Sequence, residues 1–536
     1  MGDDPLGGDP LGEPRSPKGP KKEIDRASPD PTILTNPSLA PKSDPADPTK
    51  DALGARVVRQ TTSYAFFRTI ASLSTLVSYA FLVRILERRD IGVFEIGMAY
   101  VGFGFVLGEG GLSAALVRKK GDVTQHELRV VQTTVLGLAS LLALLYLALA
   151  PWIGRLNHFT ESETWVLRVL APILVLRAFP IVPRARMQRE MRFDHFGLVE
   201  LSATLARNVT AVIAALAFGG SWALVAAALA QATAAIVAGY SLSPGWVGLG
   251  FQMHTFRRLI SFGSKVQGTY FLHYLRENVA VGLLGPALGP APVALYRFAY
   301  TYARIPSDAI GGLARVHFRM YALCEPHSEQ LASSIRTALR ASTLLGALIL
   351  GILASAAVWT IPLIYSEKWL PAVPIVWALM PHVLADIGMA QLVAMAQGQG
   401  KPGKALWFYV IWSVLTWLAC GAALLFGKNA LDWIGWGQSL GTVTAAVVAL
   451  IWAQRQASAP IISALLRPLV ALSCGAVGAY WVVRGMSGSS LLQALAGVGT
   501  FLALSATLAF TLDRTALLND LRGAVASFRK KRTTTA

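Results

Sequence analysis

Residues Val130 to Ala150 read VVQTTVLGLASLLALLYLALA, a stretch of apolar and small side chains that contains no charged residue. A helix needs ~20 residues to span the ~30 Å hydrocarbon core of a bilayer. Charged residues stand on both sides of the stretch, Arg129 before it and Arg155 after it. The stretch therefore predicts a membrane-spanning helix near 128–151.

Similar apolar stretches, separated by charged or Gly/Pro-containing loops, recur along the chain and predict about fourteen membrane-spanning helices. The first six lie near 62–84, 93–116, 128–151, 164–183, 197–218 and 221–241. Six more lie near 259–284, 291–314, 335–365, 371–397, 404–426 and 433–454, and a last pair near 461–483 and 489–511. The predicted fold class is an all-α polytopic membrane protein.

Composition supports this class. The 536 residues are 54% hydrophobic and only 15% charged, whereas a soluble domain carries about 25% charged residues. The net charge of +18 would suggest nucleic acid in a soluble protein, but here the bases stand in short loops, so we expect membrane lipids as partners and no nucleic acid. The three cysteines, Cys324, Cys420 and Cys474, lie far apart, so we expect neither a disulfide nor a metal site, and no cofactor.

Lys and Arg are distributed unevenly between the two sides, which predicts the orientation. With the N-terminus inside, the interior loops and helix ends hold Arg118, Lys119, Lys120, Arg184, Arg186, Arg189, Arg192, Arg257, Arg258, Arg315, Arg319, Arg336, Arg340, Lys401, Lys404 and Arg455. The exterior ones hold only Arg84, Arg88, Arg89, Arg155, Lys368, Lys428 and Arg484. We therefore expect both termini on the cytoplasmic side.

The domain organisation follows from the grouping of these helices. Residues 1–55 lack the apolar segment of a signal peptide and read as a disordered cytoplasmic tail. We expect a six-helix lobe over 56–245, a second over 246–456, an additional helix pair over 457–512 and a basic cytoplasmic tail over 513–536. Leu86–Phe94 (LERRDIGVF) and Leu288–Tyr296 (LGPAPVALY) share a Leu-to-aromatic spacing at equivalent places, which favours two related lobes around a central cleft.

Several charged residues fall inside the predicted helices, where each costs ~2.5–3.5 kcal/mol at the bilayer centre unless it faces a cavity or a partner. They are Glu109, Arg177, Glu200, Arg207, Arg276, Glu277, Arg297, Arg304, Asp308 and Asp386, with Arg68 nearer the inner end.

Two of these helices carry polar stripes at helical spacing. One stripe holds Gln267, Tyr270, Tyr274 and Glu277, and the other Arg297, Thr301, Arg304 and Asp308. The stripes favour a wet cavity in which tyrosines contact sugar rings and arginines bind a diphosphate. The alternative is structural: Arg276 with Glu277, and Arg304 with Asp308, are spaced to form ion pairs that hold helices together.

Gly398 to Lys404 (GQGKPGK) has the GxxxxGK spacing of a phosphate-binding P-loop. The next residue is Ala405 rather than the Ser or Thr that binds magnesium, and the segment lies between two predicted membrane helices rather than after a strand. We therefore do not expect ATP binding. The eight histidines show no metal-binding spacing, and no large exterior loop suggests a catalytic domain.

Several motifs resemble those of the Wzx-type polysaccharide flippases. Arg184 to Leu224 (RARMQREMRFDHFGLVELSATLARNVTAVIAALAFGGSWAL) resembles the fourth-to-sixth helix signature of that family. Further similar elements, in the same order as in the family, are Gly108–Leu112, Ala115–Arg118, Phe262–Gly263, Asn278–Gly289, Leu295–Tyr300 and Glu367–Ala372. The likeness extends from about residue 56 to 455.

This resemblance implies the MOP-superfamily fold, with two six-helix lobes around a cationic cleft and alternating access. It implies a transporter rather than an enzyme, in the bacterial inner membrane. Its substrates would be undecaprenyl-diphosphate-linked oligosaccharides flipped to the outer leaflet for O-antigen, capsule or exopolysaccharide assembly, beside a polymerase and other assembly proteins. The sequence departs from the family at Ala280 and Glu109, which stand where the family has Asp.

We therefore expect a substrate site in which arginines neutralise the diphosphate and tyrosines contact the sugar: Arg207, Arg276, Arg297, Arg304, Tyr270, Tyr274 and Tyr300. Glu109, Glu277 and Asp386 are expected to couple transport to a proton or sodium ion, or to gate it. Two other classes stay open from the sequence. One is an ion-coupled small-molecule exporter or antiporter on the same scaffold, and the other is a membrane glycosyl-transferring enzyme.

Overall fold

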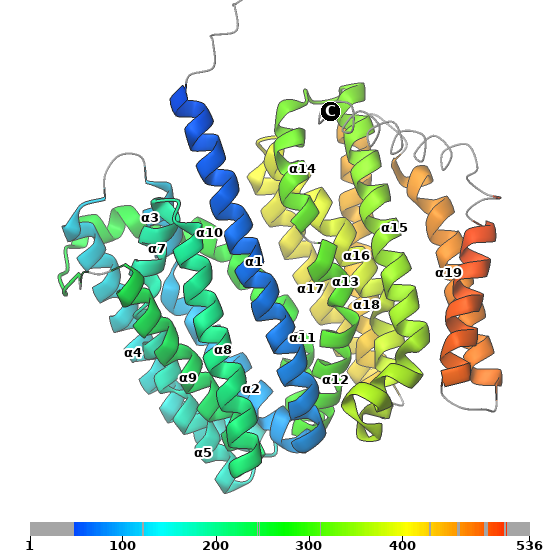
Figure 1. The fold of residues 1–536 in the computed structure, drawn as a ribbon, viewed down its shortest axis with the longest axis horizontal. Helices are drawn as coiled ribbons and strands as arrows, with labels where there is room; N and C mark the ends of the chain where they lie inside the picture. Colours follow the sequence, from blue (N-terminus) through cyan, green and yellow to red (C-terminus); the bar gives the residue numbers. More distant parts are fainter. Residues whose placement is uncertain are drawn as a thin grey trace, which may run out of the picture. The chain divides into compact units, whose positions relative to one another are not determined.

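The computed structural model describes residues 48–119, 123–243, 245, 247–310, 312–427, 430–457, 461–486, 491–508 and 511. Every regular element among these residues is a helix (Figure 1). By its contacts the chain separates into residues 1–56 and residues 57–536, and all of the packing below lies in the second unit. The predicted all-α class is confirmed.

The described residues of the first half of the chain form nine helices. They are α1 (Pro48–Ile85), α2 (Arg88–Glu109), α3 (Leu112–Arg118), α4 (Gln125–Leu156), α5 (Glu161–Leu170), α6 (Pro172–Ala178), α7 (Ile181–Arg189), α8 (Phe193–Ala217) and α9 (Gly220–Leu242). Helix α1 begins at Pro48, so residues 48–55, which were predicted to belong to the tail, are helical. Hydropathy marks only the long apolar part of a helix, and this short segment includes the helix formers Ala52, Leu53 and Ala55 beside polar residues.

The described part of the second half begins with the long helix α10 (Met253–Glu277), four short helices follow it, and most of the later helices are long. The short ones are α11 (Val279–Leu288), α12 (Pro290–Ala303), α13 (Ile305–Ile310) and α14 (Gly312–Leu323). The others are α15 (Glu329–Thr360), η3 (Ile361–Tyr365), η4 (Glu367–Ala372), α16 (Val373–Gly398), α17 (Pro402–Phe426), α18 (Ala430–Ala457) and α19 (Ile461–Gly485). A last helix runs over Leu491–Leu508.

Eleven helices in the described part of the chain are long and apolar enough to cross a membrane. Of the predicted spans, 259–284 and 291–314 have no counterpart among them, and 461–483 coincides with helix α19, several of whose side chains lie outside the described residues. The first two are interrupted: α10 ends before Asn278, and α12 ends before Arg304. The chain is therefore a multi-pass membrane protein, and the total of fourteen spans stays a prediction. The tails 1–47 and 512–536 lie outside the described residues.

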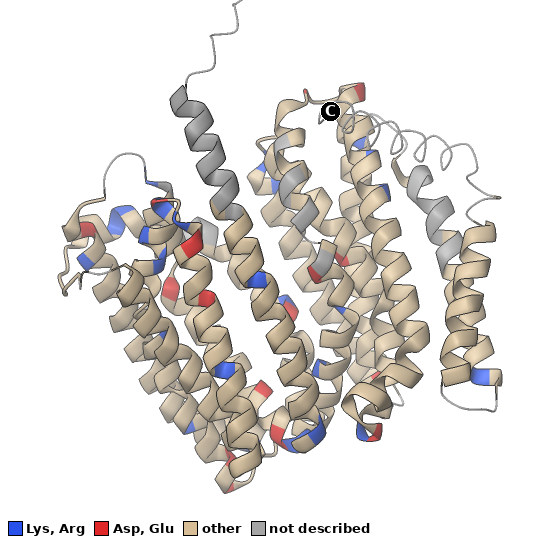
Figure 2. Cartoon of the chain, viewed as in Figure 1, with Lys and Arg blue, Asp and Glu red and all other residues tan. Residues whose placement is uncertain are grey.

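Charged residues are concentrated near the ends of the helices. Figure 2 shows long stretches of uncharged residues along the helices, with most Lys, Arg, Asp and Glu near helix ends and a few midway. Helices α10 and α12 lie where the two halves of the chain meet, since α12 packs against both α2 and α16, and α10 packs against α2, α3 and α17. The interrupted, polar segments are therefore the ones between the two halves.

Glycines allow the closest of these contacts. The α2–α3 junction turns at Gly110 and Gly111, whose φ angles are +56° and +69°. A Cβ atom on Gly111 would lie only 2.2 Å from the carbonyl oxygen of Gly263 in α10. Only glycine accepts both this backbone conformation and this approach without strain, so the junction fixes α10 against the first half.

Candidate functional site

A cavity of about 430 Å³ opens between α10 and α12, the two helices that carry the polar stripes. Its lining residues are His273, Tyr274, Glu277, Asn278, Arg297, Tyr300, Thr301, Arg304 and Asp308. Both predicted stripes contribute to it. The spacing of three and four residues that predicted one face of each helix therefore brings these side chains to one wall.

Glu277, the last residue of α10, is the centre of this wall. Its carboxylate accepts hydrogen bonds from the guanidinium groups of Arg276 and Arg304, and from the Tyr300 hydroxyl at 2.7 Å. Arg304 also lies 3.5 Å from Asp308, one turn further along. Two guanidinium groups and a phenol hydroxyl therefore hydrogen-bond to one partly buried carboxylate. In this structure Arg276 and Arg304 form ion pairs, as the structural alternative predicted.

The other end of the cavity is fixed to α2. The Arg297 side chain is paired with Glu95 at 3.0 Å, and the Tyr274 hydroxyl donates to the carbonyl oxygen of Ala99 at 2.7 Å. These contacts join residues about 200 and about 175 positions apart. The cavity wall is therefore anchored on the first half of the chain as well as on the second.

Arg276 lies behind the wall rather than on it. The side chain is only 1% exposed, and the guanidinium carbon is 3.7 Å from the ring centre of Trp412 in α17. A second carboxylate, Asp386 of α16, lies 3.6 Å away and accepts a hydrogen bond from Ser307 at 2.8 Å. The Nε and Nη1 atoms of Arg276 are buried without a hydrogen bond, but the aromatic face and the two carboxylates compensate its charge.

Three other arginines, on α6 to α8, lack the close carboxylates that surround Arg276 in the described part of the chain. Among the described residues, no carboxylate oxygen lies within 4 Å of Arg177, Arg184 or Arg207, and we call these three the first-half arginines. Arg207 donates to the Asn208 side chain at 3.2 Å and to Thr75 of α1 at 3.3 Å. Arg177 lies 5.4 Å from the Phe105 ring centre, and Nε of Arg184 is buried without a hydrogen bond.

Of the first-half arginines, Arg177 lies against α2, the helix to which the cavity wall is anchored. Tyr274, which lines the cavity, is bonded to the same helix. Arg184 follows Arg177 by seven residues, across the break between α6 and α7. Neither Glu109 nor Glu200 forms an ion pair with Arg184.

The predicted site residues thus divide. The cavity is lined by Tyr274, Glu277, Arg297, Tyr300 and Arg304. The structure places the rest elsewhere: Arg276 and Asp386 behind the wall, Arg207 between α8 and α1, Glu109 at the end of α2 bonded to Ser113, and Tyr270 on a surface with 59% of it exposed.

Sequence reasoning missed three neighbours of this site, namely Glu95, His273 and Trp412. Glu95 stands near the start of a predicted span, a position that does not distinguish a buried partner from a residue in the headgroup region. His273 precedes Arg276 by one helical turn, and this spacing was the one sequence signal that could have placed it beside the site. No sequence signal indicated Trp412, because its contact with Arg276 joins two helices that are distant in the chain.

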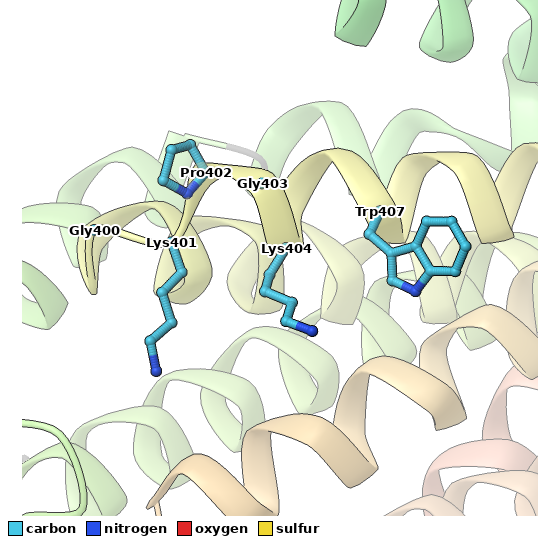
Figure 3. A pocket seen from close by; sticks show the side chains of 6 residues that line it. All are labelled: Gly400, Lys401, Pro402, Gly403, Lys404 and Trp407. Carbon is cyan, nitrogen blue, oxygen red and sulfur yellow. The ribbon is translucent and has the colours of Figure 1, made fainter. Parts of the chain in front are cut away.

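A second hollow, of about 560 Å³, coincides with the GxxxxGK segment. Figure 3 shows Lys401 and Lys404 extending from the start of α17, with Trp407 one turn further on. The Lys401 ammonium donates to Gln456 at 2.7 Å. The segment follows helix α16 rather than a strand, so it lacks the strand-to-helix turn of a P-loop.

The fold is that of membrane transporters. The structure of the lipid II flippase MurJ in an inward closed conformation is similar with a TM-score of 0.66 at 12% identity, covering 84% of this chain and 99% of that one. An inward-facing multidrug resistance MATE family transporter of the MOP superfamily is similar with a TM-score of 0.54 at 18% identity, covering 72% and 94%.

The sequence defines the family. Residues 81–374 match the family described as polysaccharide biosynthesis protein, and the chain belongs to it. The lipopolysaccharide biosynthesis protein WzxC of Escherichia coli is 23% identical over 345 residues, 62% of this chain and 66% of WzxC. The succinoglycan biosynthesis transport protein ExoT of Rhizobium meliloti is 22% identical over 67% of this chain and 73% of ExoT. The predicted resemblance to the Wzx-type family of polysaccharide biosynthesis is confirmed.

Proposed function

We propose that this protein flips undecaprenyl-diphosphate-linked oligosaccharides from the cytoplasmic to the outer leaflet of the bacterial inner membrane, for assembly of a surface polysaccharide. Family membership and the flippase-like fold support this proposal. The observation that carries it is the group of first-half arginines, which are half-buried and have no carboxylate within 4 Å in the part of the chain that the structure describes.

The physical argument concerns charge. A guanidinium inside a membrane protein is costly unless an anion compensates it, and a diphosphate provides several oxygens that accept bidentate, charge-assisted hydrogen bonds. In this account Arg177, Arg184 and Arg207 neutralise the diphosphate as it leaves the cytoplasmic side. The isoprenoid tail stays in lipid, and the sugar contacts Tyr274 and Tyr300.

The arginines that are paired with carboxylates, Arg276, Arg297 and Arg304, form what we call the paired cluster, and this cluster has a second role in this account. Arg297 and Arg304 line the cavity and contact the diphosphate further along the pathway, while Arg276 supports the wall from behind. Arg304 leaves Glu277 when the anion arrives, so that Glu277 becomes free to take up a proton or a sodium ion. Asp386 and Glu109 are the further candidates for such ion coupling or gating.

The rest of the assignment follows from this function. Both termini lie in the cytoplasm, as the Lys and Arg bias indicates. Residues 56–245 and 246–456 act as two lobes that alternate access, and 457–512 form an added pair. The protein carries out no covalent chemistry, and the polymerase and other assembly proteins act on its product.

The test is deletion of the gene followed by analysis of cell-surface polysaccharide and of lipid-linked oligosaccharide. We expect the polysaccharide to be lost and the lipid-linked unit to accumulate on the cytoplasmic leaflet. Complementation by the parent restores both, and complementation by Arg207→Met, expressed at the same level, does not.

Two outcomes would contradict the proposal. Unchanged polysaccharide together with increased sensitivity to small cationic drugs would identify an exporter. A new covalent product formed from lipid-linked sugar by the purified protein would identify a glycosyl-transferring enzyme.

A further inference from the structure

Two helices end side by side at one end of the 57–536 unit, and their ends are in direct contact. The first is α1, which ends at Ile85. The second is α15, which continues through the single π-turn η3 and ends at Tyr365. The last carbonyl groups of a helix have no partner within it and carry the negative end of the helix dipole. Two such ends placed together repel each other unless cations lie between them.

Each helix end is capped by a cation from the other segment. The Lys368 ammonium donates to the carbonyl oxygens of Arg84 at 2.9 Å and of Leu86 at 2.7 Å. In return, the Arg84 guanidinium donates to the carbonyl oxygen of Ile364 at 2.7 Å, and also to that of Leu363. We call this reciprocal arrangement the helix-end clasp.

An aromatic anchor completes the clasp. The Trp369 indole N–H donates to the carbonyl oxygen of Val83 at 2.8 Å, and the Trp369 side chain is fully buried. Its ring stacks on Phe298 of α12 with centroids 4.6 Å apart. Phe298 follows Arg297 directly, so the clasp is connected through one helix to the cavity wall.

The backbone that presents the clasp is strained. Ser366, between η3 and η4, has a φ of +116° and a ψ of 160°, a region that residues other than glycine rarely adopt. Single π-turns and such outliers are concentrated at functional and switching segments. The strained residue directly precedes η4, which carries Lys368 and Trp369 and so contacts α1.

We propose that the helix-end clasp is the gate at the outer end of the transport pathway, held shut by Arg84 and Lys368. This inference rests on the proposed function and its orientation, which place Ile85 and Tyr365 on the exterior side. When the clasp opens, the facing helix dipoles and the strain at Ser366 both drive the ends apart, and movement of Trp369 reaches the cavity through Phe298.

The gate is tested by labelling rather than by transport. The reporter is Thr301→Cys, which lines the cavity, in a chain whose exposed Cys474 is replaced by serine. A membrane-impermeant maleimide is added to the outside of intact cells and the labelling rate is measured. Lys368→Ala and Arg84→Ala should each raise the rate about tenfold, because each removes a cation and its hydrogen bonds from a helix end.

Matched variants separate the gate from general damage. Lys368→Arg should keep the slow rate, and Ser366→Gly should slow labelling further because it relieves strain only in the closed form. Arg484→Ala is the control, since Arg484 bonds Tyr480 within its own helix and should change nothing. Trp369→Phe keeps the ring stack and loses the indole donor, so it should raise the rate even if the alanine variants fail to fold.

An unchanged labelling rate in folded Lys368→Ala and Trp369→Phe proteins would overturn the gate. Faster labelling in cells whose polysaccharide does not depend on this protein would leave the gate standing and contradict the proposed substrate instead. The two ideas therefore fail separately.

Discussion

The arginines of α10 and α12 differ from those of α6 to α8 in one respect, their compensation. Arg276, Arg297 and Arg304 each lie within 4 Å of a carboxylate. The first-half arginines have none among the described residues, although Arg177 lies against α2, to which the cavity wall is anchored. A paired buried arginine is part of the scaffold until something breaks the pair, whereas in our proposal the first-half arginines are compensated by the ligand.

This difference separates residues needed for stability from residues needed for transport. Substitutions in the paired cluster should lower the stability of the fold, because removing one partner leaves a buried charge behind. The first-half arginines are where substitution should stop transport without harming the fold. The following variants test that division, and they are ordered by the size of the expected effect.

Glu277→Gln should produce the largest loss of stability, about 3 kcal/mol in the free energy of unfolding, because it leaves Arg276 buried with only Asp386 as an anion. Thermal and denaturant unfolding of the purified protein in detergent would measure it. Asp308→Asn is the control, since the Asp308 side chain is 69% exposed and its loss should cost less than about 1 kcal/mol. Equal stability of the Gln variant and the parent would contradict the scaffold role.

Arg177→Met should lower the transport rate about 10- to 100-fold, the loss expected when a charge-assisted contact to phosphate is removed. Its unfolding free energy should stay at the parent value or rise, since an uncompensated charge has been replaced by an apolar side chain. Transport of lipid-linked oligosaccharide into liposomes and the same unfolding assay give both values. A destabilised variant that transports normally would reverse the assignment.

A double-mutant cycle on Glu95 and Arg297 should give a coupling energy of about 1–2 kcal/mol, since these partly buried side chains join α2 to α12. Glu95→Gln, Arg297→Met and the double variant are compared by unfolding. Additive effects would show that the pair does not hold the two halves together.

Tyr300→Phe should have the smallest effect, a loss of about 1 kcal/mol, because it removes one hydrogen bond of 2.7 Å to Glu277 and keeps the ring. The retained ring should also keep the affinity for the sugar. Tyr300→Leu is the contrast, and it should weaken oligosaccharide binding as well.

Much of the fold was predictable because a helix that spans a bilayer needs a long run of uncharged residues. Such runs can be recognised in the sequence by their hydropathy. The interruptions at Asn278 and Arg304 were not, since hydropathy averages over the residues on either side. For the same reason the polar helices 259–284 and 291–314 were predicted as continuous spans.

For the site, the sequence could predict only which residues share one face of the same helix. Spacing placed Tyr274 with Glu277, and Arg297 with Arg304, on single faces. It could not show that Arg297 would face Glu95 rather than solvent, or that Arg276 would turn toward Trp412. Those partners are brought by helices distant in sequence, so the division between paired and unpaired arginines appears only in three dimensions.

The most direct test of the central claim is a comparison of two ligands in nanodiscs, an isoprenyl diphosphate lipid and the matching uncharged isoprenol. If the first-half arginines hold the diphosphate, the parent protein should bind the charged lipid about 100-fold more tightly. The variant with Met at positions 177, 184 and 207 should remain folded and lose that preference. Equal affinity of the parent for both lipids, or an undiminished preference in the triple variant, would contradict the account.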